Sequence, residues 1–333
     1  MVRYLNLCKL VRCAFALVIL GVSNYLQAEC KQLDQALRDK YPSYQQKTLA
    51  TESGRLVSWS QVGSDDGVPV LYAHGNPGSR FELLFFHDVA VELGLNLILM
   101  ERSGFGCSEY VEGYSLADYA EDVARLLRNQ KIDSPVKAFG WSSGGPPTMA
   151  LGAYLPGSVS RLAVASSYTN FGEMSAAKAI MKEYHRPGPA LSDRAPRLFH
   201  GLVWMVGWAS HRIPNVYFKM TEHEVSSSDK RLLEIKHNKN LFMLNQESAF
   251  EQGAEGAIHD LEVQWQPWPF QLAAVETPLL LLQGLEDKLV PKEFVFHMHG
   301  KTKNSELITF EKEGHLFPLN VYHQKEIFFW LLQ

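Results

Sequence analysis

Residues Val136 to Pro147 read VKAFGWSSGGPP, and this stretch decides the fold of the chain. Its first four residues favour a β-strand, and an apolar run that suits a helix, Thr148 to Tyr154, follows it. Between them Gly140, Ser142 and Gly144 fit the pattern G-x-S-x-G, which is typical of a tight turn from a strand into a helix. Glycines are expected there because side chains would collide across such a turn. The pattern therefore predicts a serine held at the end of a strand with its hydroxyl exposed.

Ser142 is the predicted nucleophile of two adjacent serines. Ser143 has Trp141 two residues before it, where the pattern requires glycine, so the register favours Ser142. A carbonyl substrate above Ser142 would face the N-terminus of the following helix, where free N–H groups stabilise a developing negative oxygen. The backbone N–H of Ser143 is therefore a predicted donor of the oxyanion hole.

Around this turn, predicted strands alternate with predicted helices. Apolar runs predict buried strands, and amphipathic runs predict the helices between them. The predicted strands are 44–50, 55–62, 68–73, 95–100, 136–139, 162–168, 278–284 and 307–310, and the predicted helices are 33–41, 81–93, 115–128, 148–154, 291–299 and 318–332. This alternation predicts a doubly wound α/β fold, with catalytic groups on loops at the carboxyl ends of the strands.

Size and composition agree with an ordinary globular protein. The chain has 333 residues, of which 46% are hydrophobic and 20% charged, and this excludes a mainly disordered protein. The formal net charge of -4 gives no general attraction to nucleic acid, and the mature part has no basic run. No nucleic-acid partner is therefore predicted.

The first 28 residues have the layout of a secretory signal peptide. Arg3, Lys9 and Arg12 precede the apolar run Cys13–Val22, and Ala28 is a small residue at the expected cleavage site. The run is shorter than the about 20 residues that cross a bilayer, so no stable membrane span is expected after cleavage. We expect a secreted or periplasmic protein, and an uncleaved N-terminal membrane anchor is the alternative.

Two of the four cysteines, Cys8 and Cys13, would leave with the signal peptide. Cys30 and Cys107 would remain, and in an oxidising compartment they could form a disulfide bond. Two cysteines do not define a disulfide framework, so the sequence leaves both pairing and two separate thiols open.

Residues 171–270 interrupt the alternation of strands and helices. They contain no convincing strand, but they do contain helical patterns and many aromatic residues and methionines. We interpret them as a helical cap over the active site. The predicted organisation is a signal peptide at 1–28, a catalytic core at 29–170 and 271–333, and a cap at 171–270.

The partners of the serine follow in the order expected for this kind of fold, an acid and then a histidine. A nucleophilic serine needs a base, and the base needs an orienting carboxylate. Residues 284–291 read GLEDKLVP directly after a predicted strand, and the spacing D-x-x-V-P favours Asp287 over Glu286 as that carboxylate. His315 follows a glycine at the end of the next predicted strand and is the predicted base.

The loop after the strand 68–73 supplies the second predicted oxyanion donor. It reads HGNPG at 74–78, and Asn76 is the expected donor through its backbone N–H, while His74 is expected to support the loop. The remaining histidines show no ligand spacing, since His297 and His299 lie two apart on a predicted helix and do not face each other. No metal and no cofactor are predicted.

Five short motifs in order resemble those of the α/β-hydrolase superfamily, in particular its serine esterase, haloperoxidase-like and epoxide-hydrolase-like branch. They are HGNPG at 74–78, ERSGFGCS at 101–108, GWSSGG at 140–145, GLEDKLVP at 284–291 and GH at 314–315. The resemblance covers nearly the whole mature chain. It implies a mostly parallel eight-stranded sheet, a helical cap inserted after the sixth strand, and a catalytic triad of Ser142, Asp287 and His315.

Two departures from the family pattern bear on function. Epoxide hydrolases and haloalkane dehalogenases of this branch use an aspartate nucleophile, and Ser142 argues against both activities because a serine cannot form their alkyl-carboxylate intermediate. Glu101 and Ser103 flank Arg102 where the family commonly has aspartate and proline.

The sequence favours a serine hydrolase that cleaves carboxylic esters of small molecules through an acyl-enzyme. With the same triad, the chain could be an aminopeptidase of the proline-iminopeptidase type, an amidase or a lactonase. A lid carboxylate such as Glu173, Glu222 or Glu224 could then bind an amine. The alternative from another class is a non-catalytic binding protein that has kept the fold. The sequence gives neither the acyl chain length nor the oligomeric state.

Overall fold

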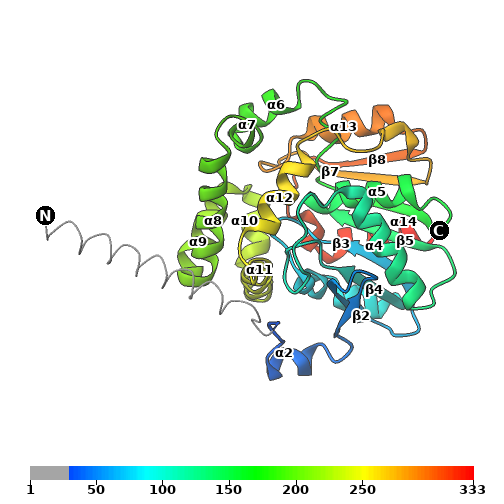
Figure 1. Cartoon of the computed structure of the whole chain (residues 1–333). Helices are drawn as coiled ribbons and strands as arrows, with labels where there is room; N and C mark the ends of the chain where they lie inside the picture. The colour runs from blue at the N-terminus through cyan, green and yellow to red at the C-terminus, as the bar shows by residue number, and fades with distance from the viewer. Residues whose placement is uncertain (1–29) are drawn as a thin grey trace, which may run out of the picture. The chain divides into compact units, whose positions relative to one another are not determined.

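The computed structural model describes residues 30–333, and Leu33–Gln333 form one compact unit (Figure 1). The predicted signal peptide, residues 1–28, lies outside the described residues, so export stays a prediction. No helix of the described part has both the length and the hydropathy to cross a bilayer.

Eight strands form one sheet in the order β1-β2-β4-β3-β5-β6-β7-β8. Strands β1 and β2 form an antiparallel hairpin, β2 pairs antiparallel with β4, and the other pairs are parallel. The predicted doubly wound, mostly parallel eight-stranded sheet is therefore confirmed. The strands are β1 (Gln45–Ala50), β2 (Leu56–Gly63), β3 (Val68–Ala73), β4 (Leu95–Met100), β5 (Val136–Trp141), β6 (Val159–Ala165), β7 (Leu279–Gly284) and β8 (Ser305–Phe310).

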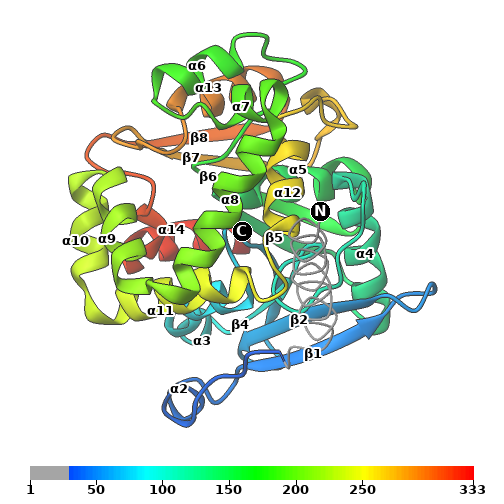
Figure 2. The same ribbon diagram turned by 60° about the vertical axis from the view of Figure 1, so that its left-hand side comes forward.

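Helices cover both faces of the sheet because successive side chains of a strand point to opposite faces. In β7, Leu279 and Leu281 pack in one core with helices α4, α5 and α13, while Leu280 and Leu282 pack in a second core with α3 and α14. Figure 2 shows these helices around the sheet. These helices are α3 (His87–Glu92), α4 (Leu116–Asn129), α5 (Gly145–Tyr154), α13 (Lys292–Lys301) and α14 (Val321–Leu332). The shorter elements of the unit are α2 (Gln35–Lys40), η1 (Arg80–Phe85), η2 (Ser142–Gly144), η3 (Leu272–Ala274) and η4 (Phe317–Leu319).

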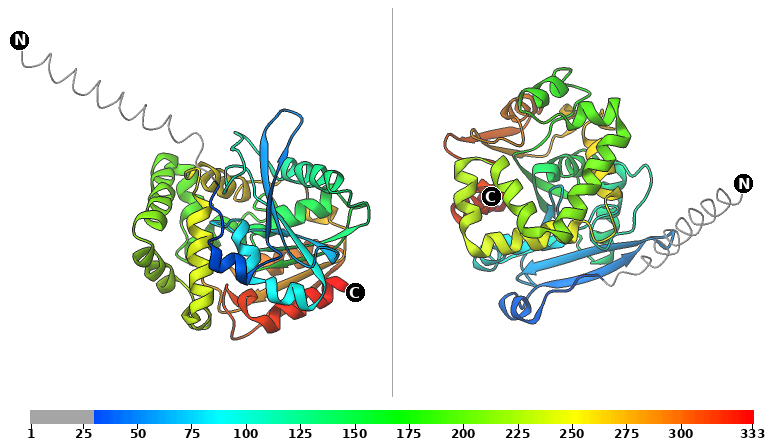
Figure 3. Two further views of the ribbon diagram at one scale, coloured as in Figure 1. Left: turned by 90° about the horizontal axis from the view of Figure 1, so that it is seen from below. Right: turned by 90° about the vertical axis from the view of Figure 1, so that its left-hand side faces the viewer.

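Seven α-helices, the 3₁₀ helix η3 and no strand lie between β6 and β7, and we call residues 171–270 the helical insertion. Helices α8 to α11 of the insertion lie together across one end of the sheet (Figures 1 and 3). The division of the chain into a separate core and cap stays a prediction. The helices are α6 (Ala177–Glu183), α7 (Gly188–Arg194), α8 (Pro196–Arg212), α9 (Pro214–Glu224), α10 (Ser227–Glu234), α11 (Lys236–Ala249) and α12 (Glu255–Gln264).

Several predicted elements have different limits in the structure, and two of these differences follow from the backbone conformation. Strand β6 ends at Ala165 and not at residue 168, because Ser166 has a φ of 46° and an extended strand cannot continue through that conformation. The predicted helix 81–93 is divided at Phe86, whose φ of -105° and ψ of -1° separate η1 from α3. The first part is a 3₁₀ helix that holds the buried side chains of Arg80 and Glu82.

Candidate active site

Ser142 lies on a sharp turn between β5 and helix α5. Its φ is 57°, in the left-handed region that residues with a side chain adopt at a cost of about 1–3 kcal/mol. A Cβ on Gly140 would overlap the carbonyl oxygen of Gly144, and a Cβ on Gly144 would overlap that of Ala73. The turn therefore requires both glycines of the G-x-S-x-G pattern.

The two serines of the turn differ in exposure. Ser142 is partly exposed and lines a cavity of about 740 Å³, whereas Ser143 is 1% exposed and does not line it. A substrate in the cavity can therefore reach the Ser142 hydroxyl, and the Ser143 side chain lies beneath it.

Asp287 and His315 meet at the carboxyl ends of β7 and β8. The His315 Nδ1 lies 2.8 Å from the Asp287 Oδ2, and both residues are buried. Asp287 Oδ1 accepts the backbone N–H groups of Leu289 and Val290, which fix the carboxylate. Glu286 is exposed, so the geometry agrees with the choice of Asp287 as the orienting acid.

The Asp287 carboxylate fixes the tautomer of His315. An ionised carboxylate only accepts hydrogen bonds, so the Nδ1 of His315 carries the proton and its Nε2 has a free lone pair. Burial lowers the pKa of the His315 imidazole, but the charge and hydrogen bond of Asp287 outweigh it and hold the pKa above its ordinary 6.5. Ser142 and His315 line the same cavity, with no hydrogen bond between their side chains in this structure.

The backbone of the His315 loop is anchored on two sides. The indole Nε1 of Trp141, the residue before the nucleophile, donates to the His315 carbonyl oxygen over 2.9 Å. Asp229 of α10 accepts the N–H of His315 over 3.0 Å and that of Leu316 over 2.7 Å. The helical insertion therefore contributes a buried carboxylate that positions this loop, a contact that the sequence analysis did not find.

The loop after β3 carries the other predicted oxyanion donor. The N–H of Gly75 donates to Glu82 over 2.9 Å, and the side chain of Asn76 donates to Asp260 over 2.8 Å. The backbone N–H of Asn76 is therefore the candidate donor of this loop, beside the N–H of Ser143.

His74 holds this loop in place. Its Nδ1 lies 2.8 Å from the Gly75 carbonyl oxygen and its Nε2 accepts the N–H of Arg102 over 3.2 Å, an arrangement that assigns the proton to Nδ1. Burial, and then the charge of Arg102, lower the pKa of the His74 imidazole well below its ordinary value. His74 is thus neutral and fully bonded, which suits a supporting role.

Helix α12 of the insertion joins the two candidate oxyanion donors. Asp260 accepts from Arg102 over 2.7 and 3.0 Å and from Asn76, and Gln264 donates to Asp260 over 2.9 Å. The same amide of Gln264 donates to the carbonyl oxygen of Ser143 over 3.0 Å. Asp260 and Gln264 are four residues apart and share one face of the helix, so α12 links the residues that carry both predicted donors.

Replacement of Asp260 by alanine is expected to lower the free energy of unfolding by about 3–5 kcal/mol, because Arg102 would keep a buried guanidinium without its counter-charge. Arg102 is 3% exposed. Urea unfolding measures the change. The control is Asp193→Ala, which breaks the more exposed pair with Lys178 and is expected to cost no more than about 1 kcal/mol. An equal effect of the two substitutions would contradict the role given to Asp260.

Glu82 is a buried carboxyl group beside the nucleophile. It lines the cavity and accepts from the Tyr72 hydroxyl over 3.1 Å and from the Gly75 N–H. Burial raises the pKa of the Glu82 carboxyl from its ordinary 4.5 to about 7, although both hydrogen bonds act against that rise. The sequence analysis did not identify Glu82 as a residue of the site.

Glu82→Gln is expected to change how stability depends on pH. Because its folded pKa lies above its unfolded pKa, folded Glu82 binds more protons between pH 4.5 and 7, and the free energy of unfolding falls as the pH rises through this window. Between pH 5 and pH 8, the free energy of unfolding of the wild type is expected to fall by about 2–3 kcal/mol more than that of Glu82→Gln. Urea unfolding at the two values measures the difference. The control is the exposed Glu52→Gln, whose free energy of unfolding should change with pH as that of the wild type does. If the free energies of the wild type and Glu82→Gln also change in parallel with pH, the expectation is refuted.

The cavity at this site has a volume of about 740 Å³. This lies within the range of about 300–1,000 Å³ that is typical of small-molecule sites. Its floor is formed by loops at the carboxyl ends of the strands, and its walls are mainly apolar side chains of the helical insertion. Lining residues include Gly75, Asn76, Glu82, Ser142, His315, Leu202, Met205, Val206, Trp208, Met220, Phe242 and Leu289.

Residues 30–333 contain no group of three or more histidine, cysteine, aspartate or glutamate side chains arranged to hold a metal ion. The polar groups around Ser142 are instead engaged with one another in the hydrogen bonds described above.

The sequence of the chain matches a known protein family. A family model described as alpha/beta hydrolase fold matches residues 68–320. The chain is also 24% identical over 275 residues to YcgS, an uncharacterized hydrolase of Bacillus subtilis (strain 168), and the match covers 81% of this chain and 91% of that protein.

Solved structures show the same fold. A thermophilic esterase from Thermogutta terrifontis has a TM-score of 0.62 at 18% identity, with 86% of this chain and 98% of that chain covered. An esterase from Exiguobacterium antarcticum has a TM-score of 0.60 at 18% identity, with 86% and 99% covered. At identities this low, the structural similarity is evidence for the fold alone.

Proposed function

Because the chain belongs to the alpha/beta hydrolase family, we propose that it is a serine hydrolase that cleaves carboxylic esters through an acyl-enzyme. The observation that carries this proposal is the shared cavity of Ser142 and a His315 ring whose Nδ1 is held by Asp287. A neighbouring base of the correct tautomer activates a hydroxyl as a nucleophile, and His315 is the proposed base.

The first half of the proposed reaction forms the acyl-enzyme. The Ser142 Oγ attacks the ester carbonyl carbon while its proton passes to His315 Nε2. The N–H groups of Asn76 and Ser143 stabilise the negative oxygen of the tetrahedral intermediate. The bond between the carbonyl carbon and the alcohol oxygen then breaks, and His315 gives the proton to the departing alcohol.

The second half releases the acid. Water attacks the carbonyl carbon of the acyl group on Ser142, and His315 takes a proton from that water. The bond to the Ser142 Oγ breaks, the oxygen regains its proton from His315, and the carboxylic acid leaves. One ester and one water thus give one acid and one alcohol.

Two of the three carboxylates proposed for amine recognition, Glu173 and Glu224, are already engaged in the structure. Glu173 accepts from Asn170 and from the Leu272 N–H, and Glu224 forms an ion pair with Arg186 over 3.2 Å. An ester substrate needs no free carboxylate to bind an amine, so these contacts favour ester cleavage over aminopeptidase activity.

The test compares p-nitrophenyl esters of graded acyl length with aminoacyl-arylamides and lactones. We expect the highest kcat/KM among the esters, together with stoichiometric labelling by a fluorophosphonate that peptide mapping assigns to Ser142. Preferred turnover of arylamides or lactones would replace the ester assignment. Absence of both labelling and turnover would favour a non-catalytic binding protein.

A further inference from the structure

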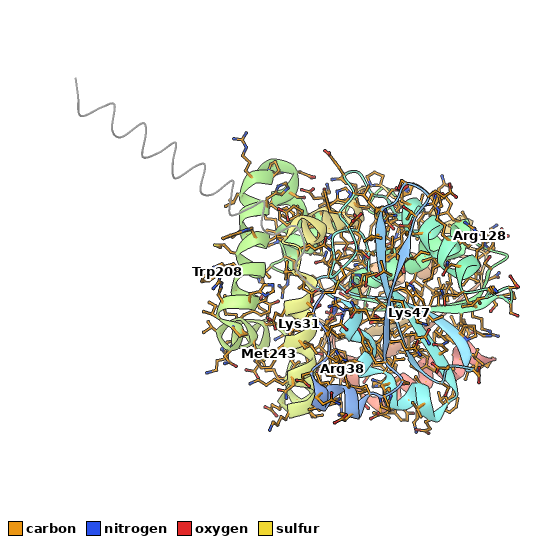
Figure 4. All side chains as sticks on the ribbon, turned by 60° about the horizontal axis from the view of Figure 1, so that its bottom comes forward. Lys31, Arg38, Lys47, Arg128, Trp208 and Met243 are labelled. Atoms are coloured by element: carbon orange, nitrogen blue, oxygen red, sulfur yellow. The ribbon has the colours of Figure 1, made fainter. Side chains whose placement is uncertain are left out.

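Exposed apolar side chains are concentrated on helices α8 and α9 of the helical insertion. Of the eighteen large apolar side chains that are exposed in residues 30–333, nine lie between Leu198 and Met220. Trp204 is 57% exposed and Met220 is 62% exposed. Figure 4 shows Trp208 at the outer edge of the molecule. Apolar patches of this kind mark interaction sites, because isolated soluble proteins rarely leave them in water.

This apolar face is continuous with the wall of the catalytic cavity. Five of the nine exposed residues also line that cavity: Leu202, Met205, Val206, Trp208 and Met220. The cavity that holds Ser142 therefore opens beside the apolar face. Whatever covers α8 and α9 also controls entry to the site.

The charges around the face favour a lipid surface. Helix α8 contains no carboxylate, and its exposed Arg197 and Arg212 lie near its two ends, with the exposed Lys219 on α9. Tryptophans between apolar and charged side chains, with arginine and lysine at the rim, are typical of helices that lie in a membrane interface. Helix α9 also carries Glu222 and Glu224 in its last turn, and Glu224 pairs with Arg186.

A lipid layer also meets the requirement that substrate must enter. A partner protein or a second copy on α8 and α9 would close the mouth of the cavity, whereas a lipid layer would cover the same apolar side chains and supply acyl chains to it. An apolar wall binds such a chain by withdrawing it from water.

We infer that α8 and α9 bind the surface of anionic lipid aggregates and that the cavity takes the acyl chain of a lipid ester from that surface. The inference that α8 and α9 bind lipid does not depend on the proposed esterase function, whereas the inferred substrate class rests on it. The scissile step is the ester hydrolysis described above, with water as co-reactant.

The experiment measures binding of the full chain to vesicles of phosphatidylcholine with 30% phosphatidylglycerol, used here as a probe, by flotation. The test variant carries Leu198→Ser, Trp204→Ser and Val216→Ser, three exposed residues that do not line the cavity. We expect its affinity for the vesicles to fall by more than about tenfold, because three apolar side chains no longer leave water. Pure phosphatidylcholine and raised salt should weaken wild-type binding.

The matched control places serine at Val321, Tyr322 and Phe329, which are equally exposed on α14. It should keep wild-type binding. All three proteins should hydrolyse p-nitrophenyl acetate alike, while the test variant alone should lose activity on long-chain esters presented in the vesicles.

Three results would overturn the inference. They are equal vesicle binding by the wild type and the test variant, no binding by either, or a concentration-dependent dimer that only the test variant loses. The proposed function is tested separately by p-nitrophenyl acetate. If that ester is not hydrolysed but vesicle binding depends on α8 and α9, the esterase proposal fails while the lipid surface stands.

Discussion

Replacement of Ser142 by alanine is expected to lower kcat/KM for p-nitrophenyl butyrate by a factor of about 10⁴–10⁶, the range that serine hydrolases show when the nucleophile is removed. Without the hydroxyl no acyl-enzyme can form, and only the oxyanion donors and the binding cavity remain. The fold should be retained, because alanine at a φ of 57° differs from serine only by the lost oxygen.

The matched control is Ser143→Ala. The Ser143 side chain is buried, and its proposed contribution is a backbone N–H, which alanine keeps. Activity within about tenfold of the wild type is expected, since no transition-state interaction is removed. If Ser143→Ala abolishes turnover and Ser142→Ala does not, the nucleophile has been assigned to the wrong serine. Circular dichroism of both variants separates loss of chemistry from loss of structure.

Asp287→Asn is expected to reduce kcat by about 10⁴-fold with little change in structure. The amide is nearly isosteric, and its oxygen can still accept from the N–H groups of Leu289 and Val290. The NH₂ group of the new asparagine would then donate to His315 Nδ1, and the imidazole proton would move to Nε2. A protonated Nε2 cannot accept the proton of Ser142. The exposed Glu286→Gln is the control and should retain wild-type activity. Similar losses in the two variants would argue against Asp287 as the orienting acid.

The pH profile gives a second readout of the same pair. His315 must be neutral to act as a base, and its raised pKa keeps it protonated to a higher pH. The acidic limb of kcat/KM in the wild type is therefore expected to lie above pH 6.5, with activity falling as the pH falls through it. In the residual activity of Asp287→Asn this limb should move to lower pH, because the charge of Asp287 no longer opposes the effect of burial on the imidazole and only the weaker effect of Asp229 remains. An unchanged limb would show that another group controls it.

The parts of the site that could be predicted from the sequence follow strand ends. Ser142, Asp287 and His315 each lie within five residues of the end of a strand, and the carboxyl ends of parallel strands meet at one edge of a sheet. The local pattern therefore carried enough information to bring them to the same region. The choice of Asp287 over Glu286 also agrees with their burial.

The parts that could not be predicted depend on contacts between distant segments. Asp260 reaches Arg102 across 158 residues of sequence, and Asp229 reaches His315 across 86. A helical pattern says which face of a helix is apolar, but not which loop its few buried carboxylates meet. The sequence gives a weak signal for Glu82, which is an acid among the apolar residues 81–86. It gives no signal for the interruption of the helix at Phe86.

The anchoring of both active-site loops by α10 and α12 has a consequence for engineering. Exchanging the whole helical insertion for that of a relative, in order to alter specificity, would remove Asp229, Asp260 and Gln264 together with the substrate-contacting wall. A successful graft would have to be confined to α8 and α9 and leave the two anchoring helices native. In this chain the helices that line the cavity wall, α8 and α9, can be exchanged without α10 and α12, but the whole insertion cannot be exchanged without losing the contacts that anchor the active-site loops.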